Sequence, residues 1–416
     1  MMKRIVIFFI IAAIVSMQHS PFFLAQSNEE LKAAFVKNDD LWLKVEDKEK
    51  RITNGEYVRY PQWSFDGNWI AYIRGVKKNE FPIFEGDLWL YNVKQNHHTK
   101  VLPNVNKNFQ WAPHNNILAL QSANDLKTID AQSLHQLQNI TSGIENFSWL
   151  PDGSGFLTSS KAGENVFSDI VLSKVLFNRK KNQYQSHHFY TIHVGRNDYF
   201  YGTSQFKWSY DNRWIAFQLV PTASLSANSN TLSILSNDGS HFHKFGEMLH
   251  YEEWFQWAPT TNSLGYIEGF GRGTIQNKKL KVEDIVNNTN ILFSPKGFVD
   301  RDLTWKTDNQ IFVSRSLESD WLDVELRPMP SIYRINLQTN KQRKITSPSS
   351  KEGDFYPQWI SNENKLIWIR TDRDHASVLI ADTNGEDQKK WIENIDIGSW
   401  YYEHWEWDEV FSLYQP

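Results

Sequence analysis

One stretch near the start of the chain limits most strongly what this sequence can fold into: Pro61-Gln62-Trp63, then Asp66-Gly67-Asn68, then Ile70-Ala71-Tyr72. In an extended segment, Pro61 and Trp63 point to the same side, and Ile70 and Tyr72 repeat this period of two residues. Asp-Gly-Asn between the two segments is typical of a tight turn. The stretch therefore predicts a β-hairpin with one apolar face.

The same hairpin pattern returns along the chain at intervals that suit one structural class. Its copies are marked by Trp63, Trp111, Trp149, Trp208, Trp257, Trp305 and Trp359. These tryptophans are separated by 48, 38, 59, 49, 48 and 54 residues, close to the roughly 40 to 50 residues of one four-stranded propeller blade. The apolar period of two excludes a helical solenoid. We therefore expect an all-β fold, a β-propeller of four-stranded blades.

The two ends of the repeat region complement each other. Residues 40–45 and 50–53 match the outer two strands of later copies, whereas residues 404–414 resemble a hairpin without outer strands. Pairing of the N- and C-terminal strands would close the ring and leave no unpaired edge. This composite blade gives eight blades, and seven is the alternative because the turn of the last hairpin is shortened. Residues 31–36 are expected to form a helical or irregular lead-in.

The first 25 residues follow the pattern of a secretory signal peptide. Lys3 and Arg4 precede an apolar run from Ile5 to Met17, and Ala25 is a small residue suited to cleavage. The run has 13 residues, fewer than the roughly 20 that span a bilayer as a helix; an uncleaved anchor is the alternative. We expect a signal peptide at 1–25, a lead-in segment at 26–39 and a single propeller domain at 40–416. No stable membrane span would remain after cleavage.

The repeat resembles that of a known group of propellers. Pro61 to Gly67, followed by Ile70-Ala71-Tyr72-Ile73 and Asp87-Leu88-Trp89-Leu90-Tyr91, resembles the repeat of TolB-like β-propellers, which are related to tryptophan-aspartate-repeat propellers. The resemblance extends from Asp40 to Tyr414 and implies the propeller fold. The group includes periplasmic components of a cell-envelope system, propeller halves of serine peptidases and propeller lyases. Function must therefore be argued from a site, because the fold alone does not decide it.

The repeated residues themselves favour structural roles. Large apolar side chains such as the repeat tryptophans are most often buried, so we expect them to pack between neighbouring blades. The aspartates of Asp66-Gly67, Asp152-Gly153 and Asp238-Gly239 are expected to form turns by accepting hydrogen bonds from nearby backbone amides. A repeated metal site would need clustered ligands, which the sequence does not supply.

Catalytic motifs are absent from the sequence. There is no Gly-x-Ser-x-Gly nucleophile elbow, no His-Glu-x-x-His zinc helix and no cysteine. His187, His188 and His193 follow a basic stretch without the spacing of metal ligands, so a solvated hairpin tip is expected there. We expect no catalytic residue, no metal and no cofactor. The alternative is a carbohydrate-active propeller enzyme, a metal-assisted lyase or hydrolase, with a site assembled across blades from some of the 13 histidines.

Candidate binding residues follow from the geometry of a propeller. Residues four or five places before each repeat tryptophan precede the innermost strand, where they would surround the mouth of the central channel. The partner-binding residues assigned among them are Arg59, Glu145, Glu252, Glu253, Asp300, Arg301, Asp354 and Glu403. This ring of charges is mixed and leans acidic. The alternative is that such loop tips are polar only because they face water.

Charge also narrows the class of partner. The formal net charge is -4, which gives no electrostatic support for binding to nucleic acid. We therefore expect an exported, noncatalytic propeller scaffold, secreted or periplasmic, that acts as a monomer. Its expected partner is a protein or peptide at the cell envelope or outside the cell.

Overall fold

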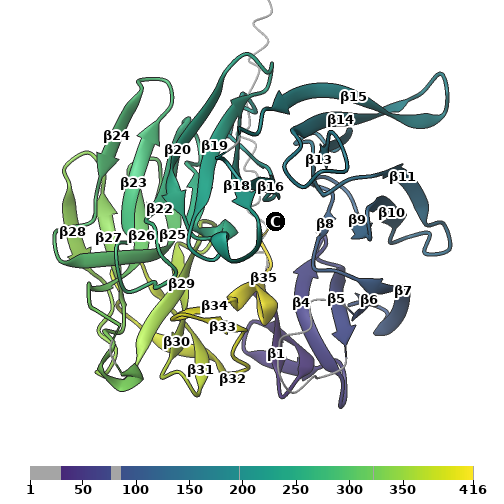
Figure 1. The fold of residues 1–416 in the computed structure, drawn as a ribbon. Helices are drawn as coiled ribbons and strands as arrows, with labels where there is room; N and C mark the ends of the chain where they lie inside the picture. Colours follow the sequence, from purple (N-terminus) through teal and green to yellow (C-terminus); the bar gives the residue numbers. More distant parts are fainter. Residues whose placement is uncertain (1–29, 76–85, 196, 322, 416) are drawn as a thin grey trace, which may run out of the picture. The chain divides into compact units, whose positions relative to one another are not determined.

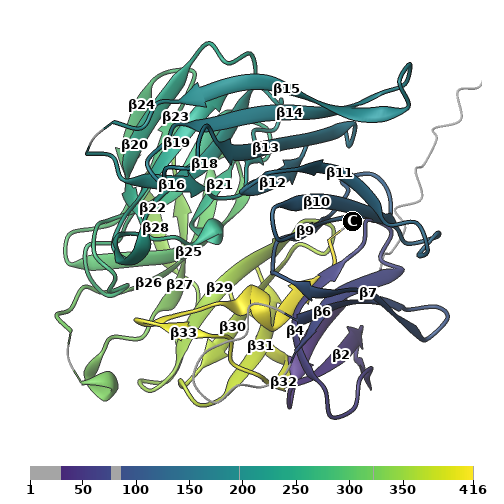
Figure 2. The same ribbon diagram turned by 45° about the vertical axis from the view of Figure 1, so that its right-hand side comes forward.

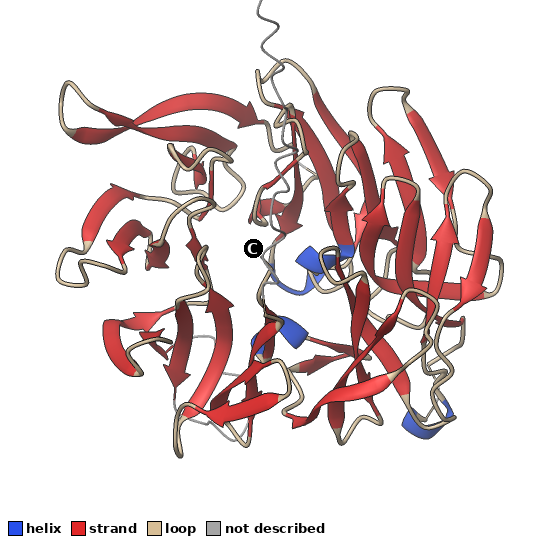
Figure 3. Ribbon diagram, turned by 180° about the vertical axis from the view of Figure 1, so that it is seen from behind, coloured by secondary structure: helices blue, strands red, loops and turns tan. Residues whose placement is uncertain are grey.

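Strands account for nearly all of the regular structure. The computed structural model describes residues 30–75, 86–195, 197–321 and 323–415. Within them, strands are joined by turns and by a few single-turn 3-10 helices (Figure 3). The signal peptide predicted at 1–25, and residues 26–29 of the lead-in, lie outside the described residues. No helix in the described ranges is long and apolar enough to cross a bilayer.

Eight antiparallel sheets with four strand positions each form the blades, and they are arranged around a central axis (Figures 1 and 2). Blade one contains β1 (Lys32–Lys37), β2 (Asp40–Val45), β3 (Lys48–Arg51) and β35 (Phe411–Leu413). Blade two contains β4 (Tyr57–Trp63), β5 (Trp69–Gly75), β6 (Gly86–Asn92) and β7 (His97–Val105). Blade three contains β8 (Phe109–Trp111), β9 (Ile117–Ser122), β10 (Asp125–Asp130) and β11 (Gln138–Ser142). Blade four contains β12 (Asn146–Trp149), β13 (Gly155–Lys161), β14 (Ile170–Asn178) and β15 (Gln183–Ile192).

The remaining blades follow the same order. Blade five contains β16 (Phe200–Thr203), β17 (Lys207–Trp208), β18 (Trp214–Pro221), β19 (Asn230–Ser236) and β20 (Phe242–Met248); β16 and β17 both pair with β18 and together form its first strand. Blade six contains β21 (Phe255–Trp257), β22 (Ser263–Glu268), β23 (Lys279–Asp284) and β24 (Thr289–Leu292). Blade seven contains β25 (Phe298–Thr307), β26 (Gln310–Leu317), β27 (Ser331–Asn336) and β28 (Lys341–Lys344). Blade eight contains β29 (Gly353–Ile360), β30 (Lys365–Thr371), β31 (Ala376–Asp382) and β32 (Lys389–Ile395).

A few short elements lie outside this regular pattern. A small hairpin follows blade eight and consists of β33 (Trp400–Tyr401) and β34 (His404–Trp405). The single-turn helices are η1 (Ala223–Leu225), η2 (Glu252–Trp254), η3 (Val324–Leu326) and η4 (Trp407–Glu409). Two of these elements, η2 and β34, supply side chains to the site described below.

The ring closes by pairing between the two ends of the repeat region, as predicted. β35 pairs with β1, with Phe411 opposite Phe35, so eight blades are confirmed. The division of strands differs from the prediction, because the N-terminal segment supplies three strands and the C-terminal segment one. The expectation of a helical or irregular lead-in at 31–36 is wrong, since Lys32–Lys37 is a strand buried along its middle. A strand covered on both faces reads as a continuous apolar run and loses the period of two.

The register of β35 shows where the repeat lies in the composite blade. Leu413 pairs with the second residue of β1, just as Trp63 pairs with the second residue of β5. In addition, Trp63 Nε1 donates to the backbone oxygen of Ser412 at 3.1 Å. Leu413 therefore occupies the tryptophan position. Glu409, and not Glu403, stands four places before it.

The repeat tryptophans join neighbouring blades. In each of five blades, the indole Nε1 donates to a backbone oxygen of the preceding blade, on the residue just before the tryptophan position. The donor and acceptor pairs, at 2.9–3.1 Å, are Trp63 to Ser412, Trp111 to Gln62, Trp149 to Gln110, Trp257 to Lys207 and Trp305 to Gln256. A half-buried indole normally finds such a partner for its N–H. The predicted packing between blades is thus confirmed.

The predicted turns are confirmed as well. Asp66, Asp152 and Asp238 each accept a hydrogen bond on Oδ1 from the backbone N–H two residues later, at 2.9, 3.0 and 2.9 Å. This is the arrangement in which aspartate mimics a backbone turn. The carboxylates therefore hold the hairpin turns.

The long insertion in blade four is the solvated hairpin that the sequence suggests. β14 and β15 extend beyond the other strands of their blade (Figures 1 and 2), and the basic residues 179–181 at their tip are exposed. His193 Nδ1 lies 2.8 Å from Asp169 Oδ2, with the His193 side chain 84% exposed. A hydrogen-bonded histidine-carboxylate contact therefore lies exposed at the base of the hairpin.

Candidate functional site

The predicted mouth residues divide into two groups. Glu145, Glu252 and Glu253 are partly exposed and line a cavity inside the ring. The other five are buried, namely Arg59, Asp300, Arg301, Asp354 and Glu403. The expectation of exposed loop tips is therefore wrong for these five residues.

Each of the buried residues has a polar or charged partner, which explains its burial. Asp300 and Asp354 lie on the first strands of blades seven and eight, directly opposite Arg315 and Arg370 on the second strands. Glu403 accepts from Arg327 at 3.0 Å. A charge is tolerated in the interior only when it is paired and hydrogen-bonded. The ion pairs and hydrogen bonds of these residues therefore compensate their charges within the fold.

The exposed acidic residues surround a cavity that we call the mouth cavity. Its volume is about 380 Å³ and its ionisable lining residues are Lys107, Glu145, His250, Glu252, Glu253, Glu406 and Asp408. Five carboxylates thus accompany one lysine, and that lysine, Lys107, is already paired with Glu406 at 2.9 Å. Walls that carry mostly one sign of charge concentrate oppositely charged ligands. The mouth cavity is therefore suited to a cation.

One residue of the cavity wall has a buried hydroxyl. Tyr60 lines the mouth cavity and is 2% exposed, and its hydroxyl has no hydrogen-bond partner among the described residues. Burial raises the pKa of Tyr60 above its ordinary value, and the charges of Glu409 and Glu406 add to that effect. Nearly all buried polar groups in proteins are hydrogen-bonded, so an exception calls for an explanation. Tyr60 is one of several described residues with such an atom, and it is the one of them that lines the mouth cavity.

A second cavity, about 820 Å³ in volume, lies next to the first. We call it the inner cavity. Its lining includes side chains of β4, β25, β29 and β35, and the mouth and inner cavities share Gln62, Glu253 and Asp408. The cavities therefore meet at these three residues inside the ring. A small ligand or ion entering the mouth can reach this junction.

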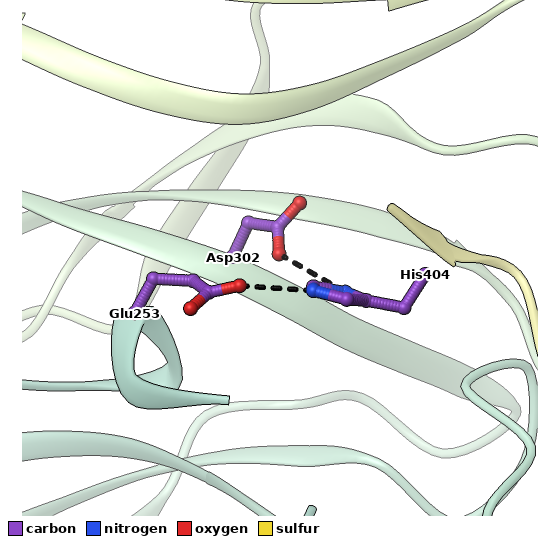
Figure 4. Close-up of side chains that lie close together, drawn as sticks. All are labelled: Glu253, Asp302 and His404. Atoms are coloured by element: carbon purple, nitrogen blue, oxygen red, sulfur yellow. Dashed lines mark hydrogen bonds and ion pairs between the residues drawn. The ribbon is translucent and has the colours of Figure 1, made fainter. Parts of the chain in front are cut away.

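Three side chains from distant parts of the sequence come together near the junction (Figure 4). Glu253 belongs to η2, Asp302 to β25 and His404 to β34. Glu253 Oε1 lies 2.9 Å from His404 Nε2, and Asp302 Oδ1 lies 3.9 Å from His404 Nδ1. His404 and Asp302 are each 2% exposed, whereas the Glu253 side chain is 26% exposed. The group offers one imidazole and two carboxylates.

Neighbouring groups shift the acidity of these carboxyls in opposite directions. Burial disfavours ionisation of Glu253, but its hydrogen bond to His404 and the charge of that histidine hold the pKa of Glu253 below its ordinary value. Burial raises the pKa of Asp302, an effect that His404 opposes and the Glu253 charge strengthens. Desolvation by the enclosing protein raises the pKa of Asp408 to about 7; Lys107 opposes this shift and Glu253 adds to it. Environments that separate the pKa values of nearby carboxyls are typical of functional sites.

The backbone is unusual at the same place. Asp302 has φ of +46° and Glu403, next to His404, has φ of +67°. Tyr60 and Tyr356, three places before their repeat tryptophans as Asp302 is before Trp305, have φ of +57° and +54°. In all three blades the first strand is bulged at this point. Bulges re-aim side chains, and positive φ at residues other than glycine often occurs at functional sites.

Sequence reasoning missed several of these residues for an identifiable reason. Asp302 and Tyr60 stand one place after the position chosen for the mouth, and the bulge turns them toward the channel. His404 and Asp408 lie in the segment between blade eight and β35, where the repeat register was misplaced. Asp302, Tyr60 and Tyr356 share one position, three places before a repeat tryptophan, and at that position the first strand is bulged in their blades.

Comparison with known proteins supports the fold. No protein-family model matches the sequence, and no curated protein matches it. Among solved structures, dihydro-heme d1 dehydrogenase NirN in complex with DHE has a TM-score of 0.59 and 14% identity over 88% of this chain and 73% of that chain. Porphyromonas gingivalis dipeptidyl peptidase 4 has a TM-score of 0.57 and 9% identity over 86% of this chain and 57% of that chain.

A lyase is similar over nearly its full length. Oligogalacturonate lyase in complex with manganese has a TM-score of 0.50 and 12% identity over 85% of this chain and 96% of that chain. By contrast, the chain matches 54% of puromycin hydrolase, about half of that protein's length. Likeness at such low identity establishes the fold and leaves the activity open. The chain is thus a β-propeller related in fold to the propellers of peptidases and to oligogalacturonate lyase.

Proposed function

We propose that this propeller is an exported, noncatalytic binding scaffold whose mouth cavity takes a cationic group of a protein or peptide partner. The observation that carries the proposal is the composition of the cavity wall. Five carboxylates accompany one lysine in about 380 Å³. A lysine or arginine side chain, or a free amino terminus, would compensate this charge.

Tyr60 lines the same cavity, and its hydroxyl would gain a hydrogen-bond partner if the side chain turned toward such a group. Its oxygen can accept from an ammonium or guanidinium donor. The cavity volume lies near the lower end of the roughly 300 to 1,000 Å³ typical of ligand sites, which suits one side chain better than a folded surface. Charge interactions are also stronger in an enclosed site than in bulk water.

The repeat itself is proposed to be of the TolB-like kind. Pro61-Gln62-Trp63 with Asp66-Gly67 carries that assignment, and the observed turn at Asp66 and indole bond of Trp63 are consistent with it. A periplasmic or secreted location fits a propeller preceded by the signal-like segment at 1–25.

The binding proposal is tested with a fluorescein-labelled Gly-Lys-Gly-Lys-Gly peptide and its glutamate counterpart at low ionic strength. We expect the lysine peptide to bind and the glutamate peptide not to bind. Replacing Glu145 and Glu252 by glutamine together should weaken the lysine peptide about tenfold, since charge complementarity governs such association. The matched control, Asp47→Asn with Glu393→Gln, removes two exposed charges, one in the turn between β2 and β3 and one on the outermost strand β32, and should leave affinity unchanged.

Two results would overturn the proposal. One is equal affinity for the lysine and glutamate peptides. The other is an equal loss of affinity for the lysine peptide in the Glu145 and Glu252 variant and in the Asp47 and Glu393 control, which would mean that net charge alone drives association. Salt titration gives a further check, because attraction to surface charges is screened at high ionic strength.

The alternative function, a metal-assisted carbohydrate-active lyase or hydrolase, is favoured by one observation, the grouping of Glu253, Asp302 and His404. Under this alternative, the purified protein would cleave a polysaccharide in the presence of a divalent metal, and His404→Gln would abolish cleavage. Release of new chain ends is the measurement. Absence of cleavage across neutral, acidic and basic polysaccharides would leave the binding role.

A further inference from the structure

The group formed by Glu253, Asp302 and His404 has the spacing of a metal site. One possible ligand atom from each residue lies within 4.8 Å of the others, and the Glu253 to His404 contact is 2.9 Å. A metal bound to nitrogen and oxygen at about 2.1 Å separates neighbouring tetrahedral ligand atoms by about 3.4 Å. Glu253 contacts Nε2 of His404 and Asp302 lies nearer Nδ1, so an ion bound to one ring nitrogen would require the carboxylate on the other side to move closer, by no more than about 1.4 Å from the present limit of 4.8 Å.

Surrounding groups hold two of the three side chains in place. Asp302 Oδ1 accepts from Trp254 Nε1 at 2.8 Å, and Asp302 Oδ2 accepts from the Tyr356 backbone N–H at 3.0 Å. Each oxygen keeps a second lone pair for another partner. The His404 ring stacks on Tyr251 with 3.5 Å between ring centroids. Such outer contacts are what orient the ligands of metal sites.

The group is also open to solvent from one direction. Glu253 and Asp302 line the inner cavity, and Glu253 lines the mouth cavity as well. A metal there would keep coordination positions facing the cavity, as catalytic or ligand-binding metals do, whereas structural metals are enclosed by four protein ligands. Glu252, Glu406 and Asp408 add negative charge nearby, which favours entry of a cation.

We infer that Glu253, Asp302 and His404 form a binding site for one divalent transition-metal ion, with open positions toward the inner cavity. The donor set selects the metal class. Imidazole suits zinc and iron, carboxylates suit manganese, and calcium and magnesium prefer sites made of oxygen alone. Zn²⁺ and Mn²⁺ are therefore the ions expected to bind.

Other contacts between histidine and carboxylate in the chain lack these properties. In the part of the chain that the structure describes, His193 contacts one carboxylate, Asp169, and His375 contacts one, Asp372; these histidine side chains are 84% and 77% exposed. Within the described ranges, Glu253, Asp302 and His404 make up the one group of three possible ligands. The surface pairs therefore serve as controls.

The experiment uses the full exported chain, stripped of metal with a chelator and titrated with ZnCl₂ and MnCl₂ by calorimetry. We expect one ion per chain. Glu253→Gln and His404→Gln should each weaken binding at least tenfold, and His193→Gln should not change it. Electron paramagnetic resonance of Mn²⁺ should report protein ligands in the parent chain and in His193→Gln, and free aqueous ion in His404→Gln.

Several outcomes would overturn the site. These are no binding of either ion up to 1 mM by the parent chain, unchanged binding in Glu253→Gln, or equal loss in His193→Gln. The parent-chain titration does not depend on any variant folding, and Glu253→Gln changes a partly exposed side chain. The inference is independent of the peptide-binding role, because the Glu145 and Glu252 variant leaves all three ligands in place.

Discussion

Arg315 donates from Nε and Nη2 to the two carboxylate oxygens of Asp300, at 2.5 and 2.7 Å. Neither side chain is more than 1% exposed. The pair joins β25 to β26, where the two residues lie directly opposite each other. Ser294 adds a third donor to Asp300. A position assigned to partner binding is therefore part of the core of blade seven.

Asp300→Ala should destabilise the propeller by about 3 to 5 kcal/mol, since removal of one partner leaves the other charge buried and uncompensated. The free energy of unfolding in urea is the measurement. Asp300→Lys, which would be harmless at an exposed loop tip, should prevent folding. Glu252→Gln is the control and should stay within about 0.5 kcal/mol. An Asp300→Ala variant as stable as the parent would show that the pair contributes nothing.

Removal of residues 410–416 should open the ring. The deletion takes away β35 and exposes the edge of β1, and an unpaired edge invites association with other chains. Phe411, 2% exposed, is the larger loss: Phe411→Ala alone should cost about 3 to 5 kcal/mol. Light scattering reports association, and thermal unfolding reports stability. Gln415→Ala, at an exposed position, should change neither; a truncated chain that melts and scatters like the parent would contradict closure.

The features of the fold that the sequence predicts are those that depend on neighbouring residues or on the repeat spacing. The Asp66 turn depends on neighbouring residues alone, and the interblade role of Trp111 follows from repetition of one apolar position. Closure follows from unmatched strands at the two ends. Each of these features leaves a signal within one repeat or in the spacing between repeats.

The parts that the sequence does not predict depend on register and on distant contacts. β1 was missed because burial on both faces removes the alternation that marks a strand. Burial of Asp354 depends on Arg370 lying opposite it on the next strand, which requires the pairing to be known. The group of Glu253, Asp302 and His404 joins residues up to 151 positions apart, so no motif could contain it.

Tyr60→Phe separates the binding role from folding. The Tyr60 hydroxyl is buried without a partner in the described part of the chain, so its removal should leave stability unchanged or raise it by about 1 kcal/mol. The same change should weaken the lysine peptide severalfold. The measurements are melting temperature and fluorescence anisotropy. Tyr72→Phe is the matched control, because the Tyr72 hydroxyl already bonds to His98 at 2.9 Å. Unchanged peptide affinity in Tyr60→Phe would show that the Tyr60 hydroxyl is not part of the binding site.

Export with cleavage near Ala25 is tested by N-terminal sequencing of the secreted or periplasmic protein. A mature chain that begins after Ala25 is expected, because the apolar run from Ile5 to Met17 suits a signal peptide. Replacement of Leu24 and Ala25 by bulky charged residues should block cleavage. Membrane-bound material with Met1 or Met2 intact in the parent chain would indicate an anchor.

Affinity for the lysine peptide should rise with pH between about 6 and 8. The surrounding protein raises the pKa of Asp408 to about 7, so this carboxyl is mostly neutral below that pH and negative above it. A cationic ligand therefore gains an attraction as the pH rises. His250 acts in the same direction at lower pH, because enclosure lowers its pKa and it loses its positive charge as the pH rises. The charged neighbours of Asp408 are Lys107, Glu253, Glu406 and Glu409, and the gain should be roughly fivefold, the upper range for one accessible ion pair.

Asp408→Asn tests the assignment of this pH dependence, since asparagine keeps the shape of the side chain and cannot ionise. The variant should bind the lysine peptide at pH 8 as weakly as the parent chain does at pH 6. Peptide binding to the parent near pH 7 should also release protons, because a bound cation favours the ionised carboxyl, and the binding enthalpy should then depend on the ionisation enthalpy of the buffer. A parent affinity that falls as the pH rises, or an equally steep profile in Asp408→Asn, would exclude Asp408 as the titrating group and would move the ligand away from the junction of the two cavities.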